Sequence, residues 1–284
     1  MSPARVPEDR ARSCGACAVD RPRGVRLLRL CLPSLIAVLV VAPPVGAVER
    51  RVVVGTDGRV ALAIAAARAR TTAAAFAARF AATGVVECGG MRGIGQLTGR
   101  ADRVTSAAHV FFDEQGRSRA ERGRCVFRAT TPAGPVEIGL VPDPSTCGST
   151  DPYAGDGRHD WAVARLVRPL AGITPYAPAG APRIGQTILV VAEEGGERTI
   201  DSCRVRDLKP GARGDLEIRT DCVGFDGLSG AAYLTDGERP RLIGVHVGFR
   251  SRHPGQAGPY AEDHHTFGAV VGSSALGRAT TAAR

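Results

Sequence analysis

The sequence predicts an all-β fold for most of the chain. From Gly84 onward, short segments rich in Val, Ile and Leu alternate with clusters of Gly, Pro and Asp, which is the usual rhythm of strands and turns. The apolar segments cover residues 97–110, 125–129, 136–141, 161–166, 187–192, 216–220, 231–234 and 242–247. Segments of this length and spacing are typical of a β-sandwich or a β-barrel.

Length and composition indicate a folded protein. The chain has 284 residues, of which 44% are hydrophobic, so it can bury one large core or two modest ones and disorder is excluded as its main state. The formal charge is +9, but the arginines are scattered and aromatic residues make up only 5% of the chain. Nucleic-acid binders concentrate cations beside aromatics, so we expect no nucleic-acid partner.

The first 47 residues have the features of a signal peptide. Arginines precede an apolar run, residues 30–42, and the small residues of segment 43–47 suit a signal peptidase. The run is about 13 residues long, whereas a membrane-spanning helix needs roughly 20. We therefore expect a secreted or periplasmic product with no membrane span after cleavage, although an uncleaved anchor stays open.

Residues 48–83 are interpreted as an N-terminal extension, and residues 84–280 as the main domain. Within the extension, segment 60–82 is dominated by alanine and lacks Gly and Pro. Its apolar residues recur at helical spacing, which predicts a single amphipathic helix. The sequence leaves open whether this segment is a pro-region, a docking helix or a cap.

The cysteines beyond residue 47 predict disulfides, because an exported protein matures in an oxidising compartment. They are Cys88, Cys125, Cys147, Cys203 and Cys222. Five is an odd number, so at most two bridges form and one thiol is left over. Cys203 and Cys222 are the preferred pair, since both lie on alternating apolar segments joined by the turn residues 209–211. The pairing of the other three stays open.

We expect no metal and no cofactor. No CxxC pair remains beyond residue 47, and no histidine stands at ligand spacing from a cysteine. His264 and His265 are adjacent, and neighbouring residues of a strand point to opposite faces, so they do not easily share one ion. We expect these two histidines on an exposed loop.

Three short motifs carry the candidate chemistry. In chain order they are VTSAAHV, ending at Val110, then DWAVARL, beginning at Asp160, and DGLSGA, around Ser229. Each motif alone has an ordinary structural explanation. Together, in this order and with these flanks, they resemble the corresponding motifs of the trypsin-like (chymotrypsin-fold) serine peptidases. The resemblance extends over residues 84–272.

The resemblance implies a fold, a site and a reaction. The fold is two six-stranded antiparallel β-barrels, with the site in the cleft between them. A serine hydroxyl is a poor nucleophile without a base, so His109 would accept the proton of Ser229, and Asp160 would fix the histidine tautomer. The N–H groups of Gly227 and Ser229 would form the oxyanion hole. No cofactor takes part.

The strand after the serine provides candidate substrate-binding residues. In this family it lies beside the specificity pocket and pairs with the substrate backbone. Here it carries Val245, His246, Val247 and Gly248. His246 is similar in placement to a histidine that glutamyl endopeptidases use to hold an acidic side chain. An ordinary hydrogen-bonded strand histidine is the alternative.

Two departures from the family pattern keep a second function open. Leu228 stands where many relatives carry Asp, and Ala231 replaces a glycine. A catalytically inactive fold that acts as an extracellular binding module is therefore the alternative to an exported, monomeric serine endopeptidase acting on proteins or peptides. An α/β-hydrolase is disfavoured, because only 55 residues follow Ser229 and they lack alternating strands and helices.

Overall fold

The computed structural model describes residues 50–212, 214–271 and 275–281. The predicted signal peptide, residues 1–47, lies outside the described residues. The described residues, from Arg50 onward, belong to one compact unit. Among the helices of the described ranges, none is long and apolar enough to cross a membrane.

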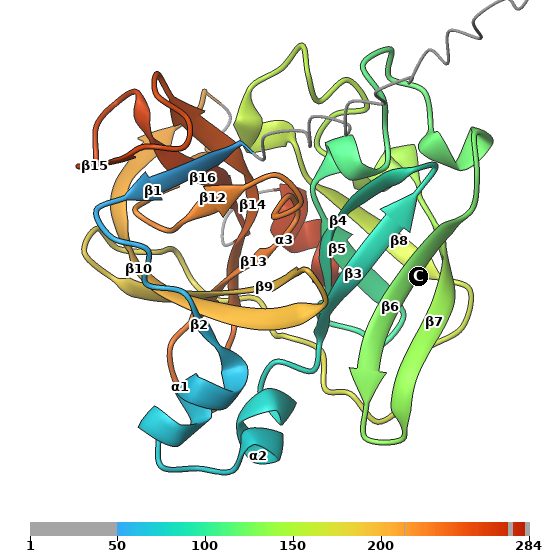
Figure 1. Cartoon of the computed structure of the whole chain (residues 1–284). Helices are drawn as coiled ribbons and strands as arrows, with labels where there is room; N and C mark the ends of the chain where they lie inside the picture. Colours follow the sequence, from blue (N-terminus) through green and yellow to red (C-terminus); the bar gives the residue numbers. More distant parts are fainter. Residues whose placement is uncertain (1–49, 213, 272–274, 282–284) are drawn as a thin grey trace, which may run out of the picture. The chain divides into compact units, whose positions relative to one another are not determined.

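The first half of this unit is a closed antiparallel barrel (Figure 1). Its strands pair in the order β3-β4-β5-β8-β7-β6, and β6 returns to β3. Their bounds are β3 Thr83–Cys88, β4 Met91–Leu97, β5 Arg103–Ser106, β6 Cys125–Thr131, β7 Gly134–Val141 and β8 Ala162–Leu166. Short 3-10 turns join them: η1 Ala108–Val110, η2 Arg119–Glu121, η3 Pro144–Thr146 and η4 Gly157–His159.

The second half forms another six-stranded ring. The strands pair in the order β11-β16-β14-β13-β9-β10, and the pairing of β10 with β11 closes the ring. Their bounds are β9 Thr187–Glu194, β10 Glu197–Pro210, β11 Leu216–Thr220, β13 Ala232–Thr235, β14 Leu242–Ser251 and β16 His264–Val270. The prediction of two six-stranded antiparallel barrels is thus confirmed.

The barrels pack against each other through apolar side chains. Val85 and Ile94 of the first barrel belong to the same buried cluster as Ile188 and Tyr233 of the second. The short helix α3, Ala275–Thr281, follows the second barrel and contacts β8 of the first. Burial of these side chains stabilises the contact between the two barrels.

The N-terminal segment is built into the second barrel. Strand β1 (Arg51–Val54) pairs with β12 (Gly224–Phe225) on one side and with β15 (Ala257–Gly258) on the other. Strand β2 (Val60–Ala61) adds to β10. Because β12 lies four residues before Ser229, β1 supports the chain that leads to that serine.

The single helix expected over residues 60–82 is wrong. Two short helices, α1 (Leu62–Arg68) and α2 (Ala73–Ala78), lie beside each other (Figure 1). Between them Arg70 has a φ of 54°, which ends the first helix. The Thr72 side chain accepts a hydrogen bond from Ala75 N at 3.2 Å and caps the second. This local capping overrides the alanine propensity.

Two further expectations need correction. The apolar segment 97–110 is not one strand: β4 ends at Leu97, and a turn precedes β5. His264 and His265 do not lie on an exposed loop but in β16, where His265 is fully buried and its Nε2 lies 2.9 Å from Arg250 Nη1. Sheet pairing with β14 buries the segment that the polar residues made look exposed.

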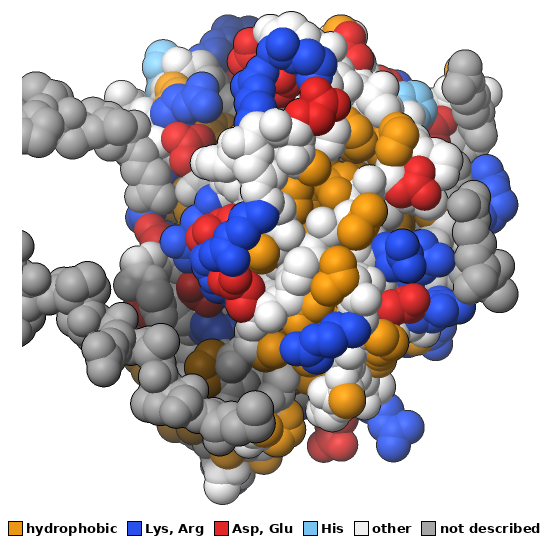
Figure 2. All heavy atoms as spheres, turned by 90° about the vertical axis from the view of Figure 1, so that its right-hand side faces the viewer, with side chains coloured by type: hydrophobic (Ala, Val, Ile, Leu, Met, Phe, Trp, Pro, Cys, Tyr) orange, Lys and Arg blue, Asp and Glu red, His pale blue; other side chains and the backbone are white. Residues whose placement is uncertain are grey.

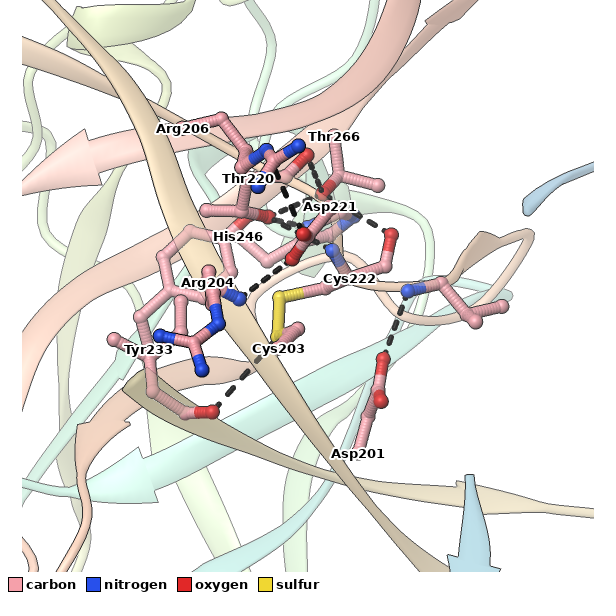
Figure 3. The surroundings of a disulfide bond; sticks show 12 residues. Asp201, Cys203, Arg204, Arg206, Thr220, Asp221, Cys222, Tyr233, His246 and Thr266 are labelled. Carbon is pink, nitrogen blue, oxygen red and sulfur yellow. Dashed lines mark hydrogen bonds and ion pairs between the residues drawn. A yellow bond between two sulfur atoms is a disulfide. The ribbon is translucent and has the colours of Figure 1, made fainter. Parts of the chain in front are cut away.

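Each barrel has one disulfide. Cys203 and Cys222 are bonded, as predicted, and Figure 3 shows this bridge beside Asp201, whose carboxylate accepts a hydrogen bond from Val223 N at 2.8 Å. Cys88 and Cys125 form the second bridge, at directly paired positions of β3 and β6. Cys147 is a free thiol, in agreement with the expected leftover cysteine.

Candidate functional site

Pairing of β5 with β8 brings His109 and Asp160 together. Ser106 at the end of β5 lies opposite Ala162 at the start of β8, so the residues just beyond these strand ends meet. His109 Nδ1 lies 2.6 Å from Asp160 Oδ2, and His109 N donates to Asp160 Oδ1 at 2.9 Å. Both side chains are buried. Two contacts fix the ring orientation and favour the tautomer with the proton on Nδ1.

Two successive tight turns, which we call the Ser229 turns (residues 225–231), present Ser229. Leu228 N donates to Phe225 O at 3.1 Å, and Ala231 N donates to Leu228 O at 3.0 Å. The third position of each turn is a glycine with positive φ, 97° at Gly227 and 85° at Gly230. Such φ values favour glycine, which explains why glycines flank the serine at this spacing.

The first barrel contacts the Ser229 turns directly. Ile94 N on β4 donates to Ser229 O at 2.8 Å. A β-carbon at Gly93 would lie 2.7 Å from the same oxygen, and one at Gly230 would lie 2.1 Å from Ser106 Oγ. The close approach of two backbones therefore requires glycine on both sides.

The three predicted residues meet at one groove. His109 and Ser229 both line it, and Asp160 lies behind His109. The groove has a volume of about 460 Å³. The other lining residues are Arg50, Met91, Arg92, Tyr153, Phe225, Asp226, Gly227, His246, Val247, Gly248 and Phe249.

Gly227 and Ser229, whose N–H groups are the predicted oxyanion hole, both line this groove. Within the described part of the chain, neither donates a hydrogen bond to a protein acceptor. Neighbouring N–H groups, such as that of Gly230, are paired, since Gly230 N donates to His246 O at 2.8 Å. Two free donors beside a serine can bind an oxygen of a ligand.

His246 lies at the inner end of the groove and is almost fully buried. Its Nδ1 is 2.9 Å from the hydroxyl of Tyr233 (Figure 3). Burial, and to a smaller degree the charge of His109, lowers the pKa of His246 to about 3. The imidazole is therefore neutral at ordinary pH. When the Tyr233 hydroxyl donates to Nδ1, Nε2 carries the proton.

Not every predicted substrate-binding residue reaches the groove. His246, Val247 and Gly248 line it. Val245 does not: its side chain is fully buried in the apolar core. The groove residues that sequence reasoning missed come from the N-terminal segment, from loops and from strands: they are Arg50, Tyr153 and Asp226 outside strands, Met91 and Arg92 in β4, Phe225 in β12 and Phe249 in β14. They carry no periodic signal, although Tyr153, a large exposed ring on a polar loop, could have drawn notice.

The described residues contain one group of potential metal ligands, Asp201 with Cys203 and Cys222. The two sulfurs are bonded to each other, so they offer no thiolates. This group is part of the disulfide environment and does not resemble a metal site.

Comparison with known proteins gives matches by structure. No protein family and no curated protein matches the chain by sequence. A solved Glu endopeptidase aligns with a TM-score of 0.58 at 15% identity, covering 80% of this chain and 97% of its own. Deg5 aligns at 0.50 with 16% identity, over 70% of this chain and 87% of its own. This chain has the chymotrypsin fold.

A thermostable serine protease from an extremophilic microorganism shares the chymotrypsin fold, with a TM-score of 0.50, 16% identity and coverage of 72% of this chain and 97% of its own. The fold that the motif resemblance implied is thereby confirmed. Within the chymotrypsin fold, Leu228 is fully buried in an apolar cluster. Apolar packing of this side chain therefore stabilises the Ser229 turns.

Proposed function

We propose that the protein is an exported serine endopeptidase. The observation that carries this proposal is the arrangement at the groove. His109 and Ser229 both line it, and His109 is hydrogen-bonded to Asp160. The serine proteases that share the fold support the same class of reaction. Fold alone does not determine function, so the proposal depends on the site.

In the proposed reaction, Ser229 Oγ attacks the carbonyl carbon of a peptide bond. His109 Nε2 takes the hydroxyl proton and returns it to the departing amine, leaving an acyl group on the serine. Water then attacks the ester, with His109 again as the base, and releases the acid. Asp160 stabilises the imidazolium through the contact at Nδ1, 2.6 Å away.

The two N–H groups of Gly227 and Ser229 would stabilise the oxyanion of each tetrahedral intermediate. A donor in such a place contributes about 2.7–4 kcal/mol to transition-state binding. Among the residues that the structure describes, neither group has a protein acceptor, which supports this role. Neither step needs a metal or a cofactor.

The groove supports a preference for an acidic side chain. A neutral His246 with its proton on Nε2 would donate a hydrogen bond to a carboxylate at the inner end of the groove. Arg50 and Arg92 also line the groove, where Arg50 pairs with Asp226 at 3.6 Å and Arg92 pairs with Glu193 at 3.0 Å. Cleavage-site profiling on a peptide library should give cuts after Glu or Asp, whereas cuts after Arg or aromatic residues alone would contradict it.

We also infer the location of the protein, its oligomeric state and its partners. Two disulfides support a secreted or periplasmic location. We expect a monomer that acts on protein or peptide substrates and binds no nucleic acid. Figure 2 supports the last point for one face, where cationic and acidic side chains lie next to each other and form no continuous basic stripe.

Labelling with a fluorophosphonate tests the proposal, because it modifies only an activated serine. We expect modification of Ser229 that is lost on His109→Ala and retained on His253→Ala, a change at an exposed histidine. A folded protein that stays unlabelled would favour the alternative, an inactive chymotrypsin fold acting as an extracellular binding module.

A further inference from the structure

Asp160 lies in a tight turn at the end of η4. Trp161 N donates to His159 O at 3.0 Å, and Asp160, between them, has a φ of −84° and a ψ of 65°. These values are those of an inverse γ-turn, which fixes the backbone of its central residue. Asp160 N also donates to Gly157 O at 3.3 Å. The position of the Asp160 carboxylate therefore depends on where η4 lies.

Although η4 leads into β8 of the first barrel, it packs against the second barrel. It contacts β16 and β11. A β-carbon at Gly157 would lie 2.5 Å from the ring of Phe267 on β16, so the turn and this ring are in close contact. Arg158 Nη1 donates to Pro210 O, at the end of β10, at 3.0 Å. Three strands of the second barrel thus surround the turn that carries Asp160.

The side chain of His159 makes a further contact with the second barrel. Its Nε2 lies 2.8 Å from Oδ2 of Asp215, which directly precedes β11. Asp215 is buried, and Arg158 Nε lies 3.9 Å from the same oxygen. An imidazole can carry a proton on Nε2 in its neutral and in its cationic form, so the contact with the carboxylate is favourable in both. The backbone of Asp215 is fixed in turn, since Gly211 N donates to its carbonyl oxygen at 2.7 Å.

The main chain of the same turn is attached to the first barrel. Gly148 N donates to Trp161 O at 2.8 Å. A β-carbon at Gly148 would collide with His159 O, so the two backbones approach closely. The backbone around Asp160 is therefore bound to the first barrel, whereas the side chain of His159 is bound to the second.

We infer that His159 and Asp215 are positioning residues for the reaction. This inference rests on the proposed function. Their contact couples the hairpin of β10 and β11 to η4, and η4 determines the place of Asp160, whose Oδ2 lies 2.6 Å from His109 Nδ1. Neither His159 nor Asp215 lines the groove. They act through Asp160, because a displaced carboxylate stabilises the imidazolium of His109 less.

Proton NMR tests this coupling without requiring catalysis. The proton in the short contact between His109 Nδ1 and Asp160 resonates far downfield, and its chemical shift follows the length of the contact. We expect His159→Ala and Asp215→Ala each to move this resonance upfield. The double variant should move it no further, because both changes remove the same contact.

Labelling kinetics test the same coupling in the reaction. Labelling at increasing fluorophosphonate concentration gives a limiting rate and a half-saturating concentration. His159→Ala and Asp215→Ala should each lower the limiting rate about tenfold, since a misplacement of about 1 Å can cost about a hundredfold. The half-saturating concentration should stay the same, because neither residue lines the groove. Asp207→Asn is the matched control, since Asp207 lies on β10 and pairs with Lys209 at 2.9 Å. It should change neither the resonance nor the rate.

The outcomes separate the inference from the proposed function. An unchanged resonance in both alanine variants, fully additive shifts in the double variant, or an equal effect of Asp207→Asn overturns the inference. A raised half-saturating concentration with an unchanged limiting rate also overturns it, because that result assigns the pair a role in binding. So does a lower melting temperature with unchanged resonance and rate, which leaves a structural role only. If the parent protein does not react with a fluorophosphonate, the proposed function is refuted, and the resonance still measures whether His159 and Asp215 position Asp160.

Discussion

At the scale of single residues, two buried titratable side chains act on stability with opposite signs. Both lie near the bridge between Cys203 and Cys222 (Figure 3). His246 resists gaining a proton, and Asp201 resists losing one. Their effects overlap between pH 4 and 6, so single variants are needed to separate them.

Replacement of His246 should flatten the acid side of the stability profile. Its pKa falls from 6.5 to about 3 on folding, so its contribution is complete above pH 6.5 and decreases as the pH falls toward 3, by up to about 1.4 kcal/mol per pH unit. Urea unfolding of His246→Gln between pH 7 and pH 5 should show a smaller decline than the parent protein. The exposed His253→Gln is the control, and equal declines in all three would contradict the assignment.

Replacement of Asp201 should stabilise the protein at neutral pH. Burial raises the pKa of Asp201 from 3.8 to about 6, so the folded state favours the protonated form and stability is lost as the pH rises through this range. Asp201→Asn should raise the free energy of unfolding at pH 8 by on the order of 2 kcal/mol and change it little at pH 4. Glu238→Gln, at an exposed site, should show no such difference, and a destabilised Asp201→Asn protein at pH 8 would refute the prediction.

At the scale of elements, glycines with positive φ differ in how closely neighbouring backbone encloses them, and Gly230 in the Ser229 turns is a tightly enclosed one. At Gly230, φ is 85° and a β-carbon would lie 2.2 Å from Ile94 O. Gly230→Ala should cost more than about 3 kcal/mol of stability and abolish labelling of Ser229, because backbone must move. Gly172 has a similar φ of 80° but open space around it, so Gly172→Ala should cost about 1 kcal/mol and leave labelling intact. Similar melting temperatures for the two variants would exclude the steric explanation.

The elements that sequence predicted are those with a local signal. His109, Asp160 and Ser229 could be found because their motifs carry turn and strand chemistry over a few residues. The end of the first helix at Arg70 and the cap at Thr72 were missed, because alanine periodicity outweighed two threonines. Tyr153 was missed as a groove residue because it lies on the irregular segment between η3 and η4, where no periodic pattern marks its side chain.

At the scale of the whole molecule, each barrel contains one disulfide. The bond between Cys88 and Cys125 encloses 37 residues of separation, so the double change Cys88→Ser and Cys125→Ser should cost about 2–4 kcal/mol of unfolding free energy. Cys147→Ser should cost about 1 kcal/mol or less, since that thiol is unbonded. Chemical denaturation checks both, and a loss below 1 kcal/mol for the double change would disprove a stabilising role.

Sequence alone could not supply the pairing of Cys88 with Cys125. It depends on the register between β3 and β6, which places the two residues opposite each other. Nor could it supply the closure of the second ring, which depends on β10 pairing with β9 and β11 at once. Long-range register of this kind is set by tertiary packing and not by local propensity.

The hydrogen bond from Ile94 to Ser229 makes the two halves of the molecule interdependent. The oxygen that receives it belongs to Ser229, the proposed nucleophile, and the donor belongs to the other barrel. Any loosening of the contact between the two barrels weakens this hydrogen bond before either barrel has unfolded. Under the proposed function, loss of reactivity at Ser229 is an early indicator of such damage, and a preparation that has lost it can still give an intact β-sheet spectrum.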